Sequence, residues 1–172
     1  MGVYFAALIL VGIIGYSLNF GAAGKQLSNH FIENIIFKEL DKSPNDPNLY
    51  QTLGDIYYNA KNYNGVKQAY EKSLTLNPDN PHVLNNLAWL YATCDDLSFR
   101  DSIRALKLSK KAVTLLKAPH ILDTLAESYF VNGKYEKAIA AELRALELVK
   151  INRSHYKKQL DKFRKAAKKA VE

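Results

Sequence analysis

The chain has 172 residues, 48% hydrophobic and 24% charged, which is enough apolar sequence for a buried core and excludes disorder throughout. Residues 25–149 hold 15 Lys and Arg against 15 Asp and Glu, so the net charge of +7 comes from the last 23 residues, which hold nine basic residues against two acidic ones. The single cysteine, Cys94, excludes an internal disulfide. We therefore expect a neutral body with a basic tail, whose fold does not depend on an oxidising compartment.

The N-terminal segment, residues 3–24, is predicted to be a transmembrane anchor. Residues 3–23 read VYFAALILVGIIGYSLNFGAA, with no charge before Lys25. At about 1.5 Å per residue, a helix of this length matches the roughly 30 Å thickness of the bilayer core. A cleaved signal peptide and a buried core helix are the alternatives. We favour the retained anchor, because a signal peptide normally begins with basic residues and has a shorter apolar run.

Three segments in the middle of the chain repeat one pattern of large and small side chains. The period is 34 residues from Leu53 to Leu87 and 38 residues from Leu87 to Leu125, because the middle segment has a longer turn, TCDDLSFRDS. Each segment has two stretches with apolar residues at i, i+3, i+4 and i+7, which predicts two amphipathic helices. The shared small positions are Gly54, Ala88 and Ala126, and the shared large positions are Tyr57, Tyr91 and Tyr129.

The string LYQTLGDIYYNAKNYNGVKQAYEKSLTLNPD resembles a tetratricopeptide repeat, and DTLAESYFVNGKYEKAIAAELRALEL is a second match. The resemblance implies an all-α, right-handed solenoid of antiparallel helix pairs with a concave groove. The repeats are expected at residues 47–80, at residues 81–118 with an extended turn, and at residues 119–152. With its anchor, the chain resembles membrane-anchored tetratricopeptide repeat proteins of the bacterial type, which implies a single-pass protein of a bacterial inner membrane.

Shorter elements flank the three repeats. Pro44 precedes Pro78 by one period, so residues 25–46 are predicted to be a linker helix and an N-terminal half-repeat that caps the stack. At the other end, residues 153–172 predict a capping helix with one apolar face and one face rich in lysine. Lys25, just after the anchor, favours the cytoplasmic side for the body, while the periplasmic side stays open.

The resemblance also implies which residues bind a partner, because the groove in this family is lined chiefly by first helices. Carried over position by position, the groove residues are Gln51, Asp55, Tyr58, Asn85, Trp89, Asp123 and Glu127. Together they form an aromatic and mildly acidic surface. Such a surface would repel an acidic C-terminal tail of the kind that chaperone adaptors with this fold bind.

No catalytic or metal-binding motif is recognisable. His30, His82, His120 and His155 are far apart in sequence and show no HxxxH, HExxH or CxxC spacing, so we expect no catalytic residue, no cofactor and no metal. His82 and His120 stand at nearly equivalent places in successive repeats and are predicted to lie on the same side. The sequence thus predicts a non-enzymatic, membrane-anchored scaffold or assembly factor that binds a membrane-complex subunit. The alternatives are an undetected enzyme and nucleic-acid or anionic-lipid binding through the basic C-terminal helix.

Overall fold

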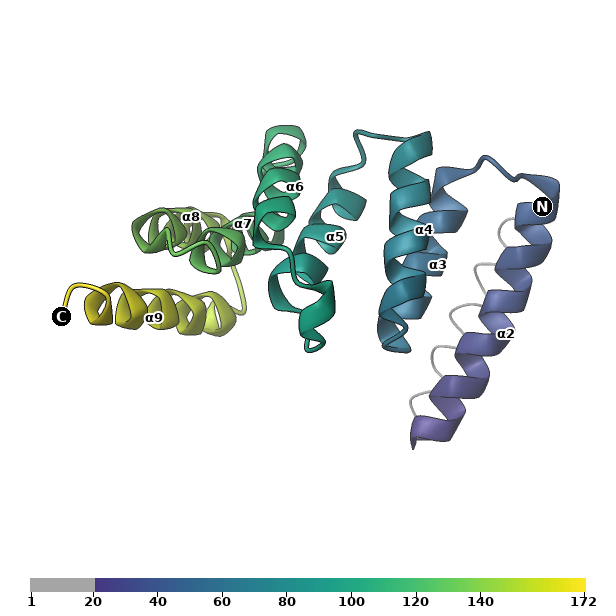
Figure 1. The fold of residues 1–172 in the computed structure, drawn as a ribbon, viewed down its shortest axis with the longest axis horizontal. Helices are drawn as coiled ribbons and strands as arrows, with labels where there is room; N and C mark the ends of the chain where they lie inside the picture. Colours follow the sequence, from purple (N-terminus) through teal and green to yellow (C-terminus); the bar gives the residue numbers. More distant parts are fainter. Residues whose placement is uncertain (1–20) are drawn as a thin grey trace. The chain divides into compact units, whose positions relative to one another are not determined.

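A computed structural model describes residues 21–172, with side chains from residue 30 onward. Over residues 21–172 the protein consists of eight α-helices, α2 to α9, and one short 3₁₀ segment, η1, without any strand (Figure 1). The described chain divides into two compact units, one up to residue 76 and the other from residue 77 to residue 172. The all-α architecture predicted from the sequence is therefore confirmed for the described residues.

The first unit contains α2 (Gly21–Lys42), α3 (Pro47–Asn59) and α4 (Tyr63–Leu76). Helix α3 begins with Pro47 after Asp46, whose side chain accepts a hydrogen bond from the Asn48 backbone N–H, and both residues favour a helix start. Helices α3 and α4 form a hairpin. They approach closely at Gly54, where an added Cβ would lie 2.3 Å from the Tyr70 ring.

Helix α2 packs on this hairpin through one apolar face. Ile36 is buried in a cluster with Leu53, Ile56 and Ala69. Nearby, the Tyr57 hydroxyl donates a 2.8 Å hydrogen bond to the carboxylate of Glu33 on α2. Burial and this carboxylate raise the pKa of Tyr57 to about 12, so the hydroxyl keeps its proton at physiological pH.

The predicted transmembrane anchor falls mostly on residues 1–20, which lie outside the described residues. Its last residues, 21–24, belong to the first turn of α2. No helix within residues 21–172 combines the length and the apolar character that crossing a bilayer requires. The anchor therefore stays a prediction from the sequence.

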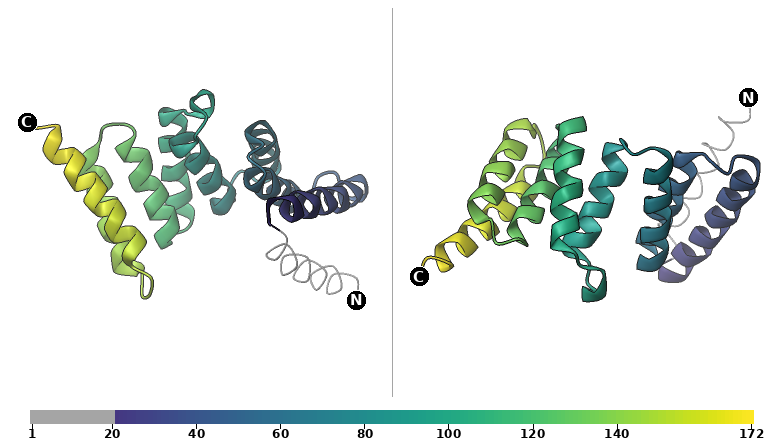
Figure 2. Two further views of the ribbon diagram at one scale, coloured as in Figure 1. Left: turned by 90° about the horizontal axis from the view of Figure 1, so that it is seen from below. Right: turned by 45° about the horizontal axis from the view of Figure 1, so that its top comes forward.

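The second unit contains two helix pairs followed by a single C-terminal helix. Their members are α5 (Pro81–Thr93), η1 (Leu97–Phe99), α6 (Ser102–Leu115), α7 (Pro119–Phe130), α8 (Tyr135–Leu148) and α9 (Ser154–Lys169). Helix α5 pairs with α6 and helix α7 pairs with α8, while α9 packs mainly on α8 (Figure 2).

Local sequence explains where these helices start and turn. Pro81 and Pro119 occupy the first turns of α5 and α7, and the Asn80 side chain accepts hydrogen bonds from the first backbone N–H groups of α5. The extended turn between α5 and α6 holds η1. It is ordered by hydrogen bonds, because the Arg100 Nε–H donates to the Cys94 carbonyl at 2.7 Å and the Asp101 N–H donates to the Tyr91 carbonyl at 3.0 Å.

The core of the second unit includes side chains from α9. Phe163 is fully buried in a cluster with Leu106, Leu125, Ala126, Ala138 and Ala141. Three of these residues are alanines, which let the α7–α8 hairpin close tightly and leave room for the Phe163 ring. Helix α9 is therefore an integral part of the second unit.

Candidate protein-interaction site

The predicted groove residues of the first unit lie on α3 and differ in exposure. Gln51 and Asp55 are half-buried, whereas Tyr58 is 37% exposed. The Asp55 carboxylate accepts a hydrogen bond from the hydroxyl of Tyr70 on α4, so it stabilises the α3–α4 hairpin. Of these three residues, Tyr58 is the most exposed and the only aromatic one.

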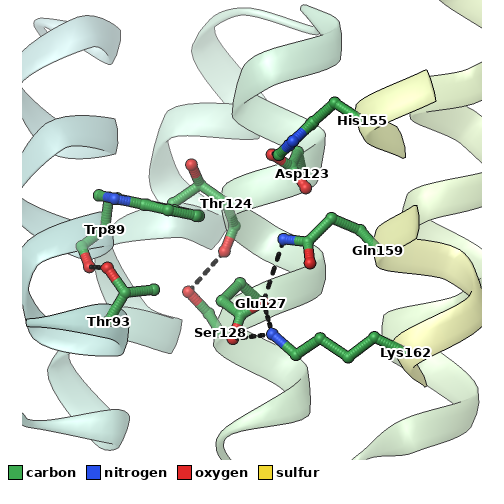
Figure 3. A network of polar contacts seen from close by, with 9 residues as sticks. All are labelled: Trp89, Thr93, Asp123, Thr124, Glu127, Ser128, His155, Gln159 and Lys162. Carbon is green, nitrogen blue, oxygen red and sulfur yellow. Dashed lines mark hydrogen bonds and ion pairs between the residues drawn. The ribbon is translucent and has the colours of Figure 1, made fainter. Parts of the chain in front are cut away.

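The predicted residues on α5 are Asn85 and Trp89. Asn85 is buried and its side-chain N–H donates a 3.2 Å hydrogen bond to the amide oxygen of Asn86. Trp89 is half-buried, and Figure 3 shows its ring extending from α5 toward α7. Trp89 is the one tryptophan of the chain, and the residue is partly accessible to solvent.

The two acidic residues predicted on α7 are buried and paired with α9 (Figure 3). Asp123 lies with its carboxylate 2.9 Å from the His155 Nε2 atom. Glu127 accepts hydrogen bonds from Lys162 at 2.6 and 2.7 Å and a longer one from the Gln159 amide at 3.4 Å. We call these five side chains the α7–α9 network. Asp123 and Glu127 are therefore buried and paired with α9, in contrast to the mildly acidic surface predicted from the sequence.

A third carboxyl group, that of Glu142 on α8, belongs to the same region. Glu142 is completely buried, and its burial together with the carboxylates of Asp123 and Glu127 raises its pKa to about 9. Its side chain is therefore protonated and neutral near pH 7. Glu142 was not among the predicted site residues, although its helical spacing to Ala138 and Ala145 is the signal that places it on the buried face of α8.

Two imidazole rings lie next to each other at the starts of α5 and α7. The rings of His82 and His120 are nearly parallel, with 7° between their planes and 6.0 Å between their centroids, so the two residues lie on the same side, as predicted. Both residues are exposed. Desolvation and the neighbouring His82 lower the pKa of His120, which favours the neutral form of the His120 ring.

No group of three or more His, Cys, Asp or Glu side chains suited to holding a metal ion occurs among residues 30–172. Trp89 and the imidazole pair contribute aromatic side chains to the surface that α5 and α7 leave open.

Comparisons with known proteins identify the repeat. Two tetratricopeptide repeat family models match the chain, one at residues 47–80 and one at residues 69–107. The uncharacterized protein ycf37 of Pyropia yezoensis is 38% identical over 74 residues, which cover 41% of this chain. The match spans only 42% of the length of that relative.

Solved structures show the same fold at low sequence identity. PilW, a type IV pilus biogenesis factor, aligns with a TM-score of 0.64 and 16% identity over 85% of this chain and 71% of its own. The first repeat domain of Spaghetti (RPAP3), bound to an HSP90 peptide, aligns with a TM-score of 0.62 and 22% identity over 70% of this chain and 92% of its own. TTC0263, a thermophilic repeat protein of Thermus thermophilus, gives a TM-score of 0.58 and 22% identity over 73% of this chain and 69% of its own.

These matches define the class of protein: residues 47–107 match tetratricopeptide repeat models, and the described chain has an all-α helical-repeat fold. The family models cover the α3–α4 pair and the chain as far as the first half of α6. The α7–α8 pair has helices of 12 and 14 residues, close to the 13 and 14 residues of the α3–α4 pair. It also has a small residue, Ala126, at the position of Gly54, which supports its interpretation as a further repeat. Tetratricopeptide repeats are protein-binding modules, so the fold suggests interaction with another protein.

Proposed function

We propose that this protein is a non-enzymatic scaffold or assembly factor, anchored in a membrane by residues 3–24, that holds a subunit of a membrane complex. The observation that carries the protein-binding part is the open aromatic surface on the first helices of the second unit. This surface consists of Trp89 and His82 on α5 and His120 on α7. Within the described residues, none of these three side chains forms a hydrogen bond.

This surface fits a protein partner better than a small molecule. Aromatic side chains that are partly exposed supply much of the binding energy in protein interfaces, and Trp is enriched among such residues. The two imidazole rings add hydrogen-bonding nitrogens that match the backbone groups of a peptide. The buried acidic groups of the α7–α9 network are already paired, so the partner need not be basic.

Affinity purification of the full chain in mild detergent tests the proposal. Trp89→Ala and the double variant His82→Gln and His120→Gln are compared with Ile103→Ala, which removes a 77% exposed aliphatic side chain from the second helix α6. We expect one membrane-complex subunit to co-purify with the wild type and the Ile103 variant. It should be reduced at least about tenfold with the Trp89 variant, as for an interface hot spot. Equal recovery by all folded variants, or a protein that carries no partner, would contradict the proposal.

The membrane location needs a separate test, because it rests on the sequence of residues 3–24. We expect the full chain to stay in membranes through a sodium carbonate wash that removes peripheral proteins. A reporter fused to the C-terminus distinguishes the cytoplasmic side, favoured by Lys25, from the periplasmic side. Release of the chain by carbonate would exclude the anchor and leave the protein-binding proposal intact.

A further inference from the structure

The outer face of α9 carries a stripe of positive charge without internal partners. We call it the basic face, and its members are Arg153, Lys157, Lys158, Arg164, Lys165, Lys168 and Lys169. All seven are exposed, and within residues 30–172 none of them forms an ion pair. Asp161 is the one acidic residue between them. The charge excess of the chain is therefore concentrated on one helix face and is available to a partner.

The packing of α9 fixes which way this face points. Leu160 and Phe163 are buried against the α7–α8 pair, so the opposite side of the helix is turned to solvent. Lys162 lies at the border and is held inward by Glu127, with its ammonium group 4.5 Å from the centre of the Phe130 ring. Helix α9 has 16 residues, so the basic face runs for about 24 Å along a straight axis.

Apolar side chains are exposed at both ends of this helix. Ile151, just before α9, is 77% exposed, and Val171, just after it, is 89% exposed. A row of cations flanked by aliphatic side chains fits the interface of an anionic bilayer, where ammonium groups meet lipid phosphates and aliphatic groups enter the acyl boundary. Exposed aromatic side chains, on which bases stack, would favour binding to nucleic acid. On α9, however, Phe163 is buried and Tyr156 is half-buried.

We infer that the basic face of α9 docks on the surface of an anionic lipid bilayer. This inference rests on the proposed membrane location, because an anchored chain keeps α9 near lipid at high effective concentration. The contact gives the repeat body a second attachment besides the anchor. It would restrict how the second unit, and so the surface formed by Trp89 and the imidazole pair, faces the membrane.

The test uses the full chain in nanodiscs of phosphatidylcholine alone and of phosphatidylcholine with phosphatidylglycerol. A fluorophore on Ser154→Cys, at the exposed start of α9, reports energy transfer to an acceptor on the lipid headgroups. Cys94 is buried and is replaced by Ala to prevent its labelling. The test variant changes Lys157, Lys158, Lys165, Lys168 and Lys169 to Gln. The matched control changes five exposed lysines outside α9 to Gln: Lys38, Lys107, Lys117, Lys134 and Lys137.

We expect energy transfer in anionic discs that falls in neutral discs, in high salt and in the test variant, but persists in the matched control. The same full chain should bind free anionic vesicles at least about tenfold more weakly after the five changes in α9. Equal transfer in neutral and anionic discs, or no loss in the test variant, would overturn the inference. Tighter binding to a duplex oligonucleotide than to anionic vesicles would overturn it in favour of nucleic acid. Release of the chain from membranes by carbonate would contradict only the anchor, because the selectivity for anionic vesicles still tests the role of α9.

Discussion

Lys162 of α9 places its ammonium nitrogen 2.6 and 2.7 Å from the two carboxylate oxygens of Glu127 on α7. The carboxylate is almost completely buried, with 5% of its side chain exposed, whereas the lysine is 41% exposed. The pair therefore joins a helix of the last repeat to the C-terminal helix. The positive charge of Lys162 also acts on Glu142, which lies in a region with two further carboxyl groups, those of Asp123 and Glu127.

Removal of the Lys162 charge should destabilise the second unit. We expect Lys162→Met to lower its free energy of unfolding by about 1–3 kcal/mol, because Glu127 then stays buried without its cation, while the exposure of Lys162 limits the loss. Urea unfolding followed by the fluorescence of Trp89 measures this change, since the one tryptophan lies in that unit.

Two further variants decide whether this loss comes from the pair. Lys165→Met removes an exposed lysine of the same helix and should change stability by less than about 0.5 kcal/mol. The double variant Lys162→Met and Glu127→Gln should recover part of the loss, because it removes the buried charge as well as its partner. If Glu127→Gln lowers stability equally with and without Lys162, the two residues are not coupled.

Glu142 should make the second unit less stable as the pH rises. Its pKa is raised from 4.5 to about 9 in the folded state, so between these values the folded protein holds a proton that the unfolded chain has released. The stabilisation is complete below about pH 4.5 and is lost as the pH rises through about 9. Glu142→Gln is neutral at every pH, so its stability relative to wild type should increase across this range.

Melting curves between pH 5 and pH 9 test this dependence, because this range spans nearly the whole interval between the unfolded and folded pKa values of about 4.5 and 9. We expect Glu142→Gln to be more stable than wild type by about 1–3 kcal/mol at the alkaline end, the usual cost of a buried polar group without full compensation. Glu147→Gln changes an exposed carboxylate of the same helix and should follow the wild-type profile. Parallel profiles for wild type and Glu142→Gln would show that Glu142 is ionised in the folded protein.

Most of the helices could be predicted because their signals are local. Pro81 and Pro119 mark helix starts, and the 34-residue spacing from Leu53 to Leu87 fixes the register of successive repeats. The spacing of Leu160 and Phe163 likewise predicted a C-terminal helix with a buried face. Such periodicity requires no knowledge of which elements meet in space.

The state of the candidate site could be predicted only in part, because it depends on contacts between distant residues. Asp123 and Glu127 stand at positions that the resemblance assigns to a groove, but His155 and Lys162 pair with them from 32 and 35 residues further along the chain. The docking angle of α9 sets these contacts, and no local pattern encodes it. Glu142 was missed because a glutamate is rarely buried, so its residue type outweighed its helical spacing to Ala138 and Ala145.

The close approach of α3 and α4 depends on Gly54. An added Cβ at this position would lie 2.3 and 2.4 Å from two carbons of the buried Tyr70 ring. Gly54→Ala should therefore destabilise the first unit by about 1–3 kcal/mol, because the gain in helix propensity is smaller than the cost of overpacking. Hydrogen exchange of the α3 and α4 amides measures the loss, and Gly54→Ala with Tyr70→Leu should lose less than the two changes added together.

The attachment of α2 to the first repeat depends on the hydrogen bond from Tyr57 to Glu33. Tyr57→Phe keeps the ring and its packing but leaves the half-buried carboxylate without this donor, so we expect a loss of about 1 kcal/mol, the typical contribution of such a bond. The amides of α2 around Glu33 should exchange faster, while those of α8 in the other unit stay unchanged and serve as the internal control. Spectrophotometric titration gives an independent check, because the wild type should have one tyrosine more with a pKa near 12 than the variant. Equal protection of α2 in both proteins would show that the buried apolar face around Ile36 holds the helix without help from this bond.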